Sequence, residues 1–288
     1  MTTELAIKVL SGAALFTLLY AAGLRLTPQE VWTALRDWRR LLALLGVNFV
    51  AVPGVTVVAA QAFGVPAPTA VAMVLLGAAP FAPVVPVFTR LVRGDLALAA
   101  GLTAVFPVFC TFLTPLVTRA AMALLPPSGE LRFQTLSILA TLLATATAPL
   151  ALGVASRRLF PEATPRLVRP AEVVSETVGA VSLIFVIASE ARGILAIGPL
   201  ALLAMGVVSE VALFLGCQPG GPDRNARRVT GLGTANRNIA LALLVAADSF
   251  PGSPVLAGVV ANGLLLLFLG LVHVGYWRWQ DHRRASAG

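Results

Sequence analysis

The sequence has few of the residues that a water-soluble protein exposes to solvent. Only 12% of its 288 residues are charged, whereas soluble domains usually carry about 25%. Hydrophobic residues make up 58% of the chain. A soluble fold of this length could not bury so much apolar surface, but a lipid bilayer would cover it. We therefore expect an integral membrane protein in contact with the lipid bilayer, with residues 1–288 forming one transmembrane domain.

Residues suited to catalysis or metal binding are equally scarce. The two cysteines, Cys110 and Cys217, stand in apolar surroundings and lack the spacing of a metal site or a redox motif. The two histidines, His273 and His282, lie near the C-terminus. Neither a GxxxxGK[ST] phosphate loop nor an HExxH motif occurs in the sequence. We therefore expect neither an enzyme nor an ATP-driven pump, and no cofactor or resident metal.

Apolar runs of about 20 residues, the length that crosses a bilayer, recur along the whole chain. Helices are expected, because lipid requires each span to satisfy its own backbone hydrogen bonds. The nine expected spans are residues 4–25, 41–64, 67–91, 96–124, 133–155, 171–190, 193–217, 228–248 and 254–277. The first run has no basic segment before it, so we expect a span rather than a cleaved signal peptide. The expected fold class is all-α and polytopic.

The basic residues are divided unevenly between the loops. Sixteen of the 21 lysines and arginines follow odd-numbered spans, which places them on one side of the membrane. The four on the other side are Lys8, Arg119, Arg132 and Arg192. Because positive charge accumulates on the cytoplasmic side, we expect the N-terminus outside and the C-terminus in the cytoplasm, in the plasma (inner) membrane. The same rule accounts for the net charge of +8 without a nucleic-acid partner.

The expected span at 67–91 contains three prolines in close succession. Pro80, Pro83 and Pro86 each lack a backbone donor and clash with the preceding turn. We therefore expect the helix to unwind near its middle.

The expected span at 228–248 is interrupted as well, at Gly231 and Gly233 and the polar residues that follow. Unwound backbone is tolerated at membrane depth only where protein or a water-filled cavity surrounds it. A pair of interrupted spans in corresponding halves is a pointer to a transporter binding site. Two kinked helices with a purely structural role are the alternative.

Arg237 lies about ten residues into the span at 228–248. An arginine at this depth costs on the order of 2.5–3.5 kcal/mol on insertion scales, so it marks a functional site. Its guanidinium has the fork geometry that binds a carboxylate, sulfonate or phosphate. The alternative is a buried ion pair with Glu210 or, second, Glu176 on a neighbouring span.

Several stretches resemble motifs of the bile acid:sodium symporter family, in the order and spacing of that family. The matching stretches are residues 23–28, Asn48-Phe49 with Pro53, Gly77 to Pro80 with Gly94-Asp95 and Leu98, Thr103 with Thr114-Pro115, Gly233 with Asn236, and Asn262-Gly263. The resemblance covers essentially the whole chain. It implies an inverted-repeat fold in which two broken helices cross at mid-membrane, and the transport of organic anions, usually with sodium.

The resemblance also suggests where the family's sodium ligands would fall. Those positions carry side chains that do not bind sodium, namely Val85, Pro86, Ala99, Gly231 and Ala235. Asn48 and Thr103 remain as a possible remnant of a cation site. The candidate substrate-binding residues are Thr234, Asn236, Arg237, Asn238 and Asn262.

The sequence therefore predicts secondary transport of a small organic anion by alternating access, with Arg237 supplying the positive charge in place of sodium. A sodium symporter remains an alternative, with a cation site rebuilt from main-chain carbonyls, Asn48, Thr103 and Thr234. A receptor or assembly protein on the same fold is another. Metalloid efflux is a third, but it would require a cysteine at the broken helix, and Cys110 is expected to lie away from the crossing. The substrate, the coupling ion and the oligomeric state stay open.

Overall fold

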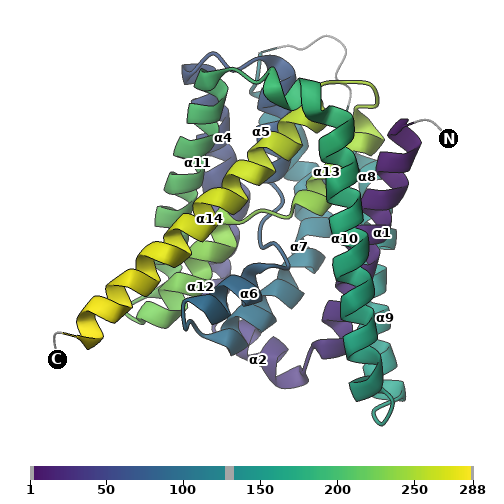
Figure 1. The fold of residues 1–288 in the computed structure, drawn as a ribbon, viewed down its shortest axis with the longest axis vertical. Coiled ribbons are helices and arrows are strands. Elements are labelled where there is room, and N and C mark those ends of the chain that lie inside the picture. The colour runs from purple at the N-terminus through teal and green to yellow at the C-terminus, as the bar shows by residue number, and fades with distance from the viewer. Residues whose placement is uncertain (1–2, 127–132, 287–288) are drawn as a thin grey trace.

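The computed structural model describes residues 3–126 and 133–286, and throughout this part of the chain the regular structure is helical (Figure 1). In chain order the helices are α1 (Thr3–Arg25), α2 (Pro28–Arg36), α3 (Trp38–Gly46), η1 (Val47–Ala51), α4 (Val52–Ala62), α5 (Ala67–Gly77), α6 (Val85–Leu91), α7 (Leu96–Ala123), α8 (Thr135–Leu142), η2 (Leu143–Thr147), α9 (Ala148–Leu159), α10 (Thr164–Leu195), α11 (Pro199–Cys217), η3 (Gln218–Gly220), α12 (Arg224–Ala235), α13 (Ile239–Ser249) and α14 (Val255–Ala285).

Eight helical segments in the described part of the chain are long and apolar enough to cross a membrane. They are α1, α3 to α4, α7, α8 to α9, α10, α11 with η3, α12 to α13, and α14. A further crossing consists of α5 and α6, which are short helices on either side of an unwound stretch. This arrangement confirms the all-α polytopic fold, and each expected span corresponds to one of these segments.

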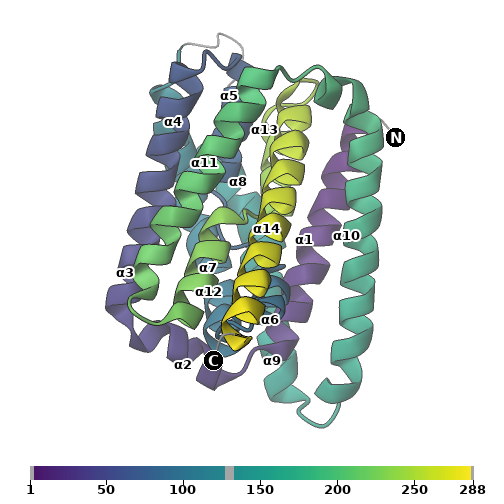
Figure 2. The same cartoon turned by 60° about the vertical axis from the view of Figure 1, so that its left-hand side comes forward.

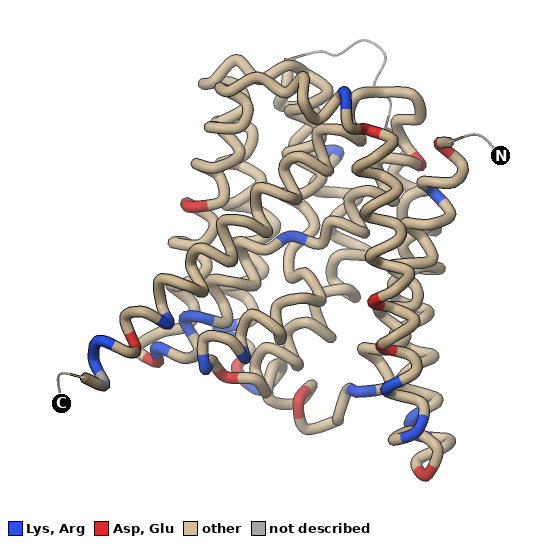
Figure 3. The backbone as a smooth tube through the Cα atoms, in the orientation of Figure 1, with Lys and Arg blue, Asp and Glu red and all other residues tan. Residues whose placement is uncertain are grey.

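The two described ends of the chain lie at opposite ends of the molecule (Figures 1 and 2). Lysine and arginine gather at the end where the C-terminus lies, whereas few occur at the opposite end (Figure 3). Arg132, which we expected on the sparsely charged side, lies outside the described residues. The basic residues of the described chain are therefore concentrated at one end of the molecule, and the expected orientation depends on this asymmetry.

The helices form two groups that meet along the centre of the molecule. On one side α1 packs against α9 and α10, and on the other α11 packs against α4, α12 and α14 (Figure 2). Gly23 of α1 faces Gly153 of α9, and a Cβ on either residue would overlap the other helix's backbone. Small residues at such contacts let helices approach closely, which is how membrane helices gain packing energy.

Two spans contain a single π-helical turn, η1 in the second span and η2 in the fifth. Each turn ends two residues before a proline, Pro53 or Pro149. Because proline has no N–H to donate to the carbonyl one turn back, the chain widens there instead of breaking. Both turns carry polar side chains into the interior, Asn48 in η1 and Thr147 in η2.

The short amphipathic helix α2 connects the first span to the second at the arginine-rich end. Thr27 caps it, accepting a hydrogen bond from the Glu30 amide at 3.3 Å, while the Glu30 carboxylate accepts one from the Thr27 amide at 2.8 Å. It packs against α7, where Gly101 leaves room for the Glu30 carbonyl. Its exposed Trp32 is typical of a helix that lies in the membrane interface.

Candidate functional site

The two interrupted spans cross at their unwound stretches, residues 78–84 and 236–238. Three backbone hydrogen bonds join them, from Phe81 N to Gly233 O (3.1 Å), from Ala82 N to Asn236 O (3.1 Å) and from Asn238 N to Ala79 O (2.8 Å). Each unwound stretch thereby satisfies backbone groups that neither lipid nor a helix would satisfy. The expected crossing of two broken helices is confirmed.

The first break lies where the prolines predict it. Pro80 and Pro83 fall within the unwound stretch, and Pro86 lies in the first turn of α6, where its missing N–H costs nothing. The second break differs from the expectation. Gly231 and Gly233 lie inside α12, and the helix is interrupted only after them, at Asn236.

The two glycines of α12 make room for one side chain of α11 and one of the first unwound stretch. A Cβ on Gly231 would overlap the Cys217 sulfur, and a Cβ on Gly233 would overlap the Phe81 ring. Phe81 has a φ of 58°, a conformation that is uncommon for residues other than glycine. Its ring stacks on Phe106 of α7 with 4.0 Å between centroids. Nothing in the sequence motifs indicated Phe81, although it forms the centre of the crossing.

Arg237 follows directly in the second unwound stretch and is 4% exposed. Its Nη1 donates a hydrogen bond to the carbonyl of Gly77 at 3.1 Å, at the C-terminal end of α5. This helix end carries unpaired carbonyls and partial negative charge, which a guanidinium offsets. Within the described residues its Nη2 has no hydrogen-bond partner.

The ion pair that we considered for Arg237 is not formed in the described structure. Glu210 instead contacts His273, with 2.9 Å between its Oε1 and the histidine Nε2. Among the described ion pairs, neither Glu210 nor Glu176 has Arg237 as partner. The sequence could not decide this, because the partner is a backbone carbonyl that any residue could supply.

The other expected binding residues are buried around the same crossing. The side-chain amide of Asn236 donates to the Leu232 carbonyl at 3.0 Å. The side chain of Asn238 caps α13 by accepting from the backbone N–H of Leu241 at 3.1 Å. Thr234 accepts from the Asn48 amide at 3.1 Å. Local hydrogen bonding therefore accounts for much of the polarity of this stretch. Asn262 of α14 differs, because its Oδ1 is buried and has no partner among the described residues.

Two polar side chains of α7 contact the first unwound stretch. Thr114 donates to the Ala78 carbonyl at 2.6 Å, and the Cys110 sulfur lies 3.8 Å from the Pro80 carbonyl. The expectation that Cys110 lies away from the crossing is wrong. Cys110 and Thr114 are four positions apart, so both lie on the face of α7 that meets this stretch.

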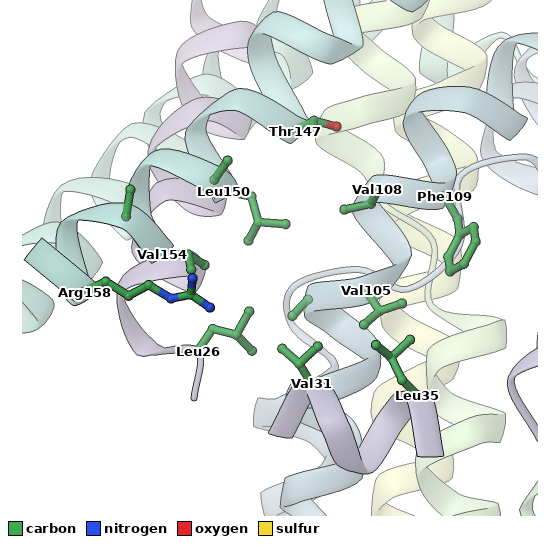
Figure 4. Close-up of a pocket in the computed structure, with 13 residues that line it drawn as sticks. Leu26, Val31, Leu35, Val105, Val108, Phe109, Thr147, Leu150, Val154 and Arg158 are labelled. Atoms are coloured by element: carbon green, nitrogen blue, oxygen red, sulfur yellow. The ribbon is translucent and has the colours of Figure 1, made fainter. Parts of the chain in front are cut away.

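A cavity of about 550 Å³ opens on another face of α7. Figure 4 shows its walls, which α2, α7 and the η2–α9 span provide. Its lining residues are Leu26, Val31, Leu35, Ala104, Val105, Val108, Phe109, Thr147, Leu150, Ala151, Val154, Ala155 and Arg158. Arg158 is the charged residue of this lining, and its guanidinium points into the cavity from α9 (Figure 4). None of the residues that the sequence suggested for substrate binding lines it.

The cavity has contacts between its walls at one end. Thr147 of η2 and Thr111 of α7 form a hydrogen bond of 2.8 Å between their hydroxyls. Beyond it, at the end of the molecule away from the arginines, Lys8 of α1 forms an ion pair with Asp248 of α13. Thr141 of α8 donates to the same carboxylate at 3.4 Å. These contacts therefore join α1 and α8 to α13 at that end.

The sequence profile of the Sodium Bile acid symporter family matches residues 13–198. The chain belongs to this family. The match covers well over half of the chain, including the first broken helix and every wall of the larger cavity. No curated protein matches it. Family and fold together make this chain a multi-pass membrane protein of the sodium-symporter-like transporter type.

The match ends at residue 198, before α11. The second broken helix and Arg237 therefore lie outside the matched residues, and only the structure shows where they are. Val85, Pro86, Ala99, Gly231 and Ala235, which stand where the resemblance places sodium ligands, belong to α6, α7 and α12. These three helices contact one another, so residues without polar side chains stand where the resemblance would place a sodium site.

Proposed function

We propose that this symporter-family protein carries a small organic anion across the plasma membrane by alternating access, without sodium coupling. The larger cavity carries the proposal for the substrate. Its walls are mainly aliphatic, and Arg158 provides a positive charge. A cavity of this size and lining suits a molecule with an apolar body and one carboxylate or sulfonate, because a few placed polar groups orient ligands in apolar pockets.

The position of this cavity supports an alternating mechanism. It lies between α2, α7 and α9, towards the arginine-rich end, whereas Lys8 and Asp248 join α1 to α13 at the other end. If the arginine-rich end faces the cytoplasm, as the positive-inside rule requires, the conformation is open inward. The proposed topology has the N-terminus outside and the C-terminus in the cytoplasm.

Arg237 supports the absence of sodium coupling. In transporters with broken helices, the C-terminal ends of half-helices and unwound carbonyls coordinate the coupling cation. Here the guanidinium of Arg237 binds the C-terminal carbonyl of α5. A fixed positive charge therefore lies where a cation would otherwise be attracted, and it repels a second one.

Sodium-coupled symport is the second candidate, and two buried oxygens favour it. Asn48 Oδ1 and Thr103 Oγ1 have no hydrogen-bond partner within the described residues, and oxygen atoms of this kind bind hard cations. In the first unwound stretch, however, the carbonyls of Ala78 and Ala79 already accept hydrogen bonds from Thr114 and Asn238. We therefore favour the sodium-independent carrier.

Thermal unfolding of the purified protein tests both candidates. A panel of amphipathic carboxylates and sulfonates would be screened in sodium buffer and in choline buffer at equal ionic strength. A ligand at a hundredfold excess over its Kd stabilises the folded state by about 2.7 kcal/mol. Equal stabilisation in both buffers is the expected result, and stabilisation in sodium alone would favour the symporter.

Uptake into proteoliposomes then separates a transporter from a receptor. The anion that stabilises the protein should accumulate inside protein-containing vesicles and not inside empty ones. Binding without uptake would overturn the transport proposal and favour a receptor on the same fold.

A further inference from the structure

A second cavity, of about 360 Å³, lies at the arginine-rich end between the start of α12 and the end of α14. Its lining residues are Cys217, Pro222, Arg224, Arg227, Arg228, Trp277, Gln280 and Arg284. Four arginines thus surround one cavity, and none of its lining residues lines the larger one. Neither transport nor the crossing of the broken helices requires such a concentration of positive charge.

Two of these arginines are held in place by a single carboxylate. Both terminal nitrogens of Arg228 contact Asp281 at 2.8 Å, and Nη1 also donates to the Val92 carbonyl at 2.7 Å. Arg224 forms an ion pair with the same carboxylate at 2.9 Å. Arg228 is 4% exposed, and its guanidinium lies 5.7 Å from the Trp277 ring centroid. The wall between α12 and α14 is therefore ordered before any ligand arrives.

The remaining two arginines are available to a ligand. Arg227 and Arg284 are exposed, and within the described residues no carboxylate lies at ion-pair distance from either. Asp281 offsets one of the four positive charges that line the cavity. The cavity therefore has an excess of positive charge, together with donors whose geometry fits phosphate oxygens.

The aromatic residues around the cavity indicate its depth in the membrane. Trp277 lines it, and Tyr276 and Trp279 are 50% and 51% exposed on the same turns of α14. The rings of Tyr276 and Trp279 stack with 6.2 Å between centroids. Exposed tryptophan and tyrosine concentrate at the level of the lipid headgroups. Phosphate groups of anionic phospholipids are at high local concentration at this level.

We propose that this cavity, which we call the arginine pocket, binds a phosphate group, with an anionic phospholipid headgroup as the source that its depth favours. Arg227 belongs to α12 and Arg284 to α14, so one phosphate contacting both links these helices. Basic pockets between membrane helices on the cytoplasmic side bind phospholipid headgroups for the same electrostatic reason. Because α12 is one half of a broken helix, the bound headgroup restrains the element that crosses α5 and α6.

The test compares two double variants of the purified protein in detergent micelles. R227Q/R284Q removes the two exposed arginines of the pocket and leaves the Asp281 ion pairs intact. R90Q/R278Q is the matched control, because Arg90 and Arg278 are also exposed at this end but do not line the pocket. Melting temperature is measured against added phosphatidylglycerol, phosphatidylcholine or inorganic phosphate at constant ionic strength.

Phosphatidylglycerol should raise the melting temperature of the unmodified protein, and phosphatidylcholine should not. Its apparent affinity should fall by about thirtyfold in R227Q/R284Q, since each arginine near an anionic surface contributes about fivefold, and should stay within twofold in R90Q/R278Q. A matching shift with inorganic phosphate would identify a soluble phosphate as the ligand, and a shift with the lipid alone would identify the membrane. An equal loss in both variants, or no shift with either phosphate source, would overturn the proposal.

Discussion

Arg237 donates a hydrogen bond of 3.1 Å to the carbonyl of Gly77. A charged side chain of the second broken helix therefore contacts the C-terminal end of α5, which is one half of the first broken helix. The contact lies within the crossing that three backbone hydrogen bonds hold together. It is the reason why we assign the charge of Arg237 to the place of a coupling cation. The contact also makes the assignment testable.

Replacing Arg237 with alanine should make the stability of the protein depend on sodium. The change removes a hydrogen bond with a charged donor, worth about 1.5–3 kcal/mol, and leaves the C-terminal carbonyl of α5 without a partner. Sodium should then bind the vacated place and raise the melting temperature relative to choline. Arg237→Lys is the matched control, because it keeps the charge and should remain indifferent to sodium. Equal stability of the alanine variant in both buffers would contradict the assignment.

Replacing Arg158 with glutamine should weaken the binding of an organic anion by about tenfold, or 1.4 kcal/mol. The guanidinium points into the larger cavity and has no ion-pair partner among the described residues, so the fold should be little affected. Binding is measured as the ligand-dependent rise in melting temperature.

The neighbouring Arg157 provides the control for this experiment. Its Nη1 donates to the carbonyls of Leu24 and Arg25 at 3.2 and 2.8 Å, and it does not line the cavity. Arg157→Gln should therefore lower stability and leave anion affinity unchanged. If Arg157→Gln weakened anion binding and Arg158→Gln did not, the larger cavity would not be the anion site.

Breaking the ion pair between Lys8 and Asp248 should favour the conformation that is open at their end of the molecule, away from the arginines. The Asp248 side chain is 9% exposed and that of Lys8 is 44% exposed, so we expect a coupling near that of surface pairs, about 0.2–1 kcal/mol. The measurement is labelling of Thr141→Cys by a membrane-impermeant maleimide, with Cys110 and Cys217 replaced by alanine.

Asp248→Asn should increase the labelling rate at residue 141 by a few fold, because 1 kcal/mol changes an equilibrium about fivefold. Glu210→Gln, which removes a carboxylate paired with His273 elsewhere, is the matched control and should leave the rate unchanged. Labelling that is unaffected by Asp248→Asn would remove the ion pair from the gating mechanism.

Replacing Gly233 with alanine should destabilise the crossing by about 1–3 kcal/mol, the usual cost of overpacking. The new methyl group would overlap the Phe81 ring. Adding Phe81→Ala should recover part of the loss, which a double-mutant cycle of thermal unfolding measures. At Gly179 of α10 a Cβ meets no atom within 4 Å, so Gly179→Ala should be neutral or stabilising. Purely additive effects at residues 233 and 81 would show that the overlap is relieved in another way.

Some features of the site could be predicted and others could not. The proline triplet at 80, 83 and 86 predicted the first break, because a missing donor and a steric clash are local properties of proline. The glycines at 231 and 233 predicted the second break at the wrong residues. A glycine in a helix shows that space is needed, and only the approach of Phe81 and Cys217 reveals which side chains use it.

Composition and the periodic spacing of apolar runs determined the class of protein, the number of spans and their approximate positions, although α10 and α14 extend beyond the expected limits. These properties depend on transfer of short segments into lipid, which each segment decides largely by itself. The partner of Arg237, the residues that line the cavity around Arg158, and the gathering of four arginines around the second cavity required the tertiary structure. Each of these depends on which helices lie side by side. That arrangement results from packing between segments distant in the sequence, and no local pattern of residues encodes it.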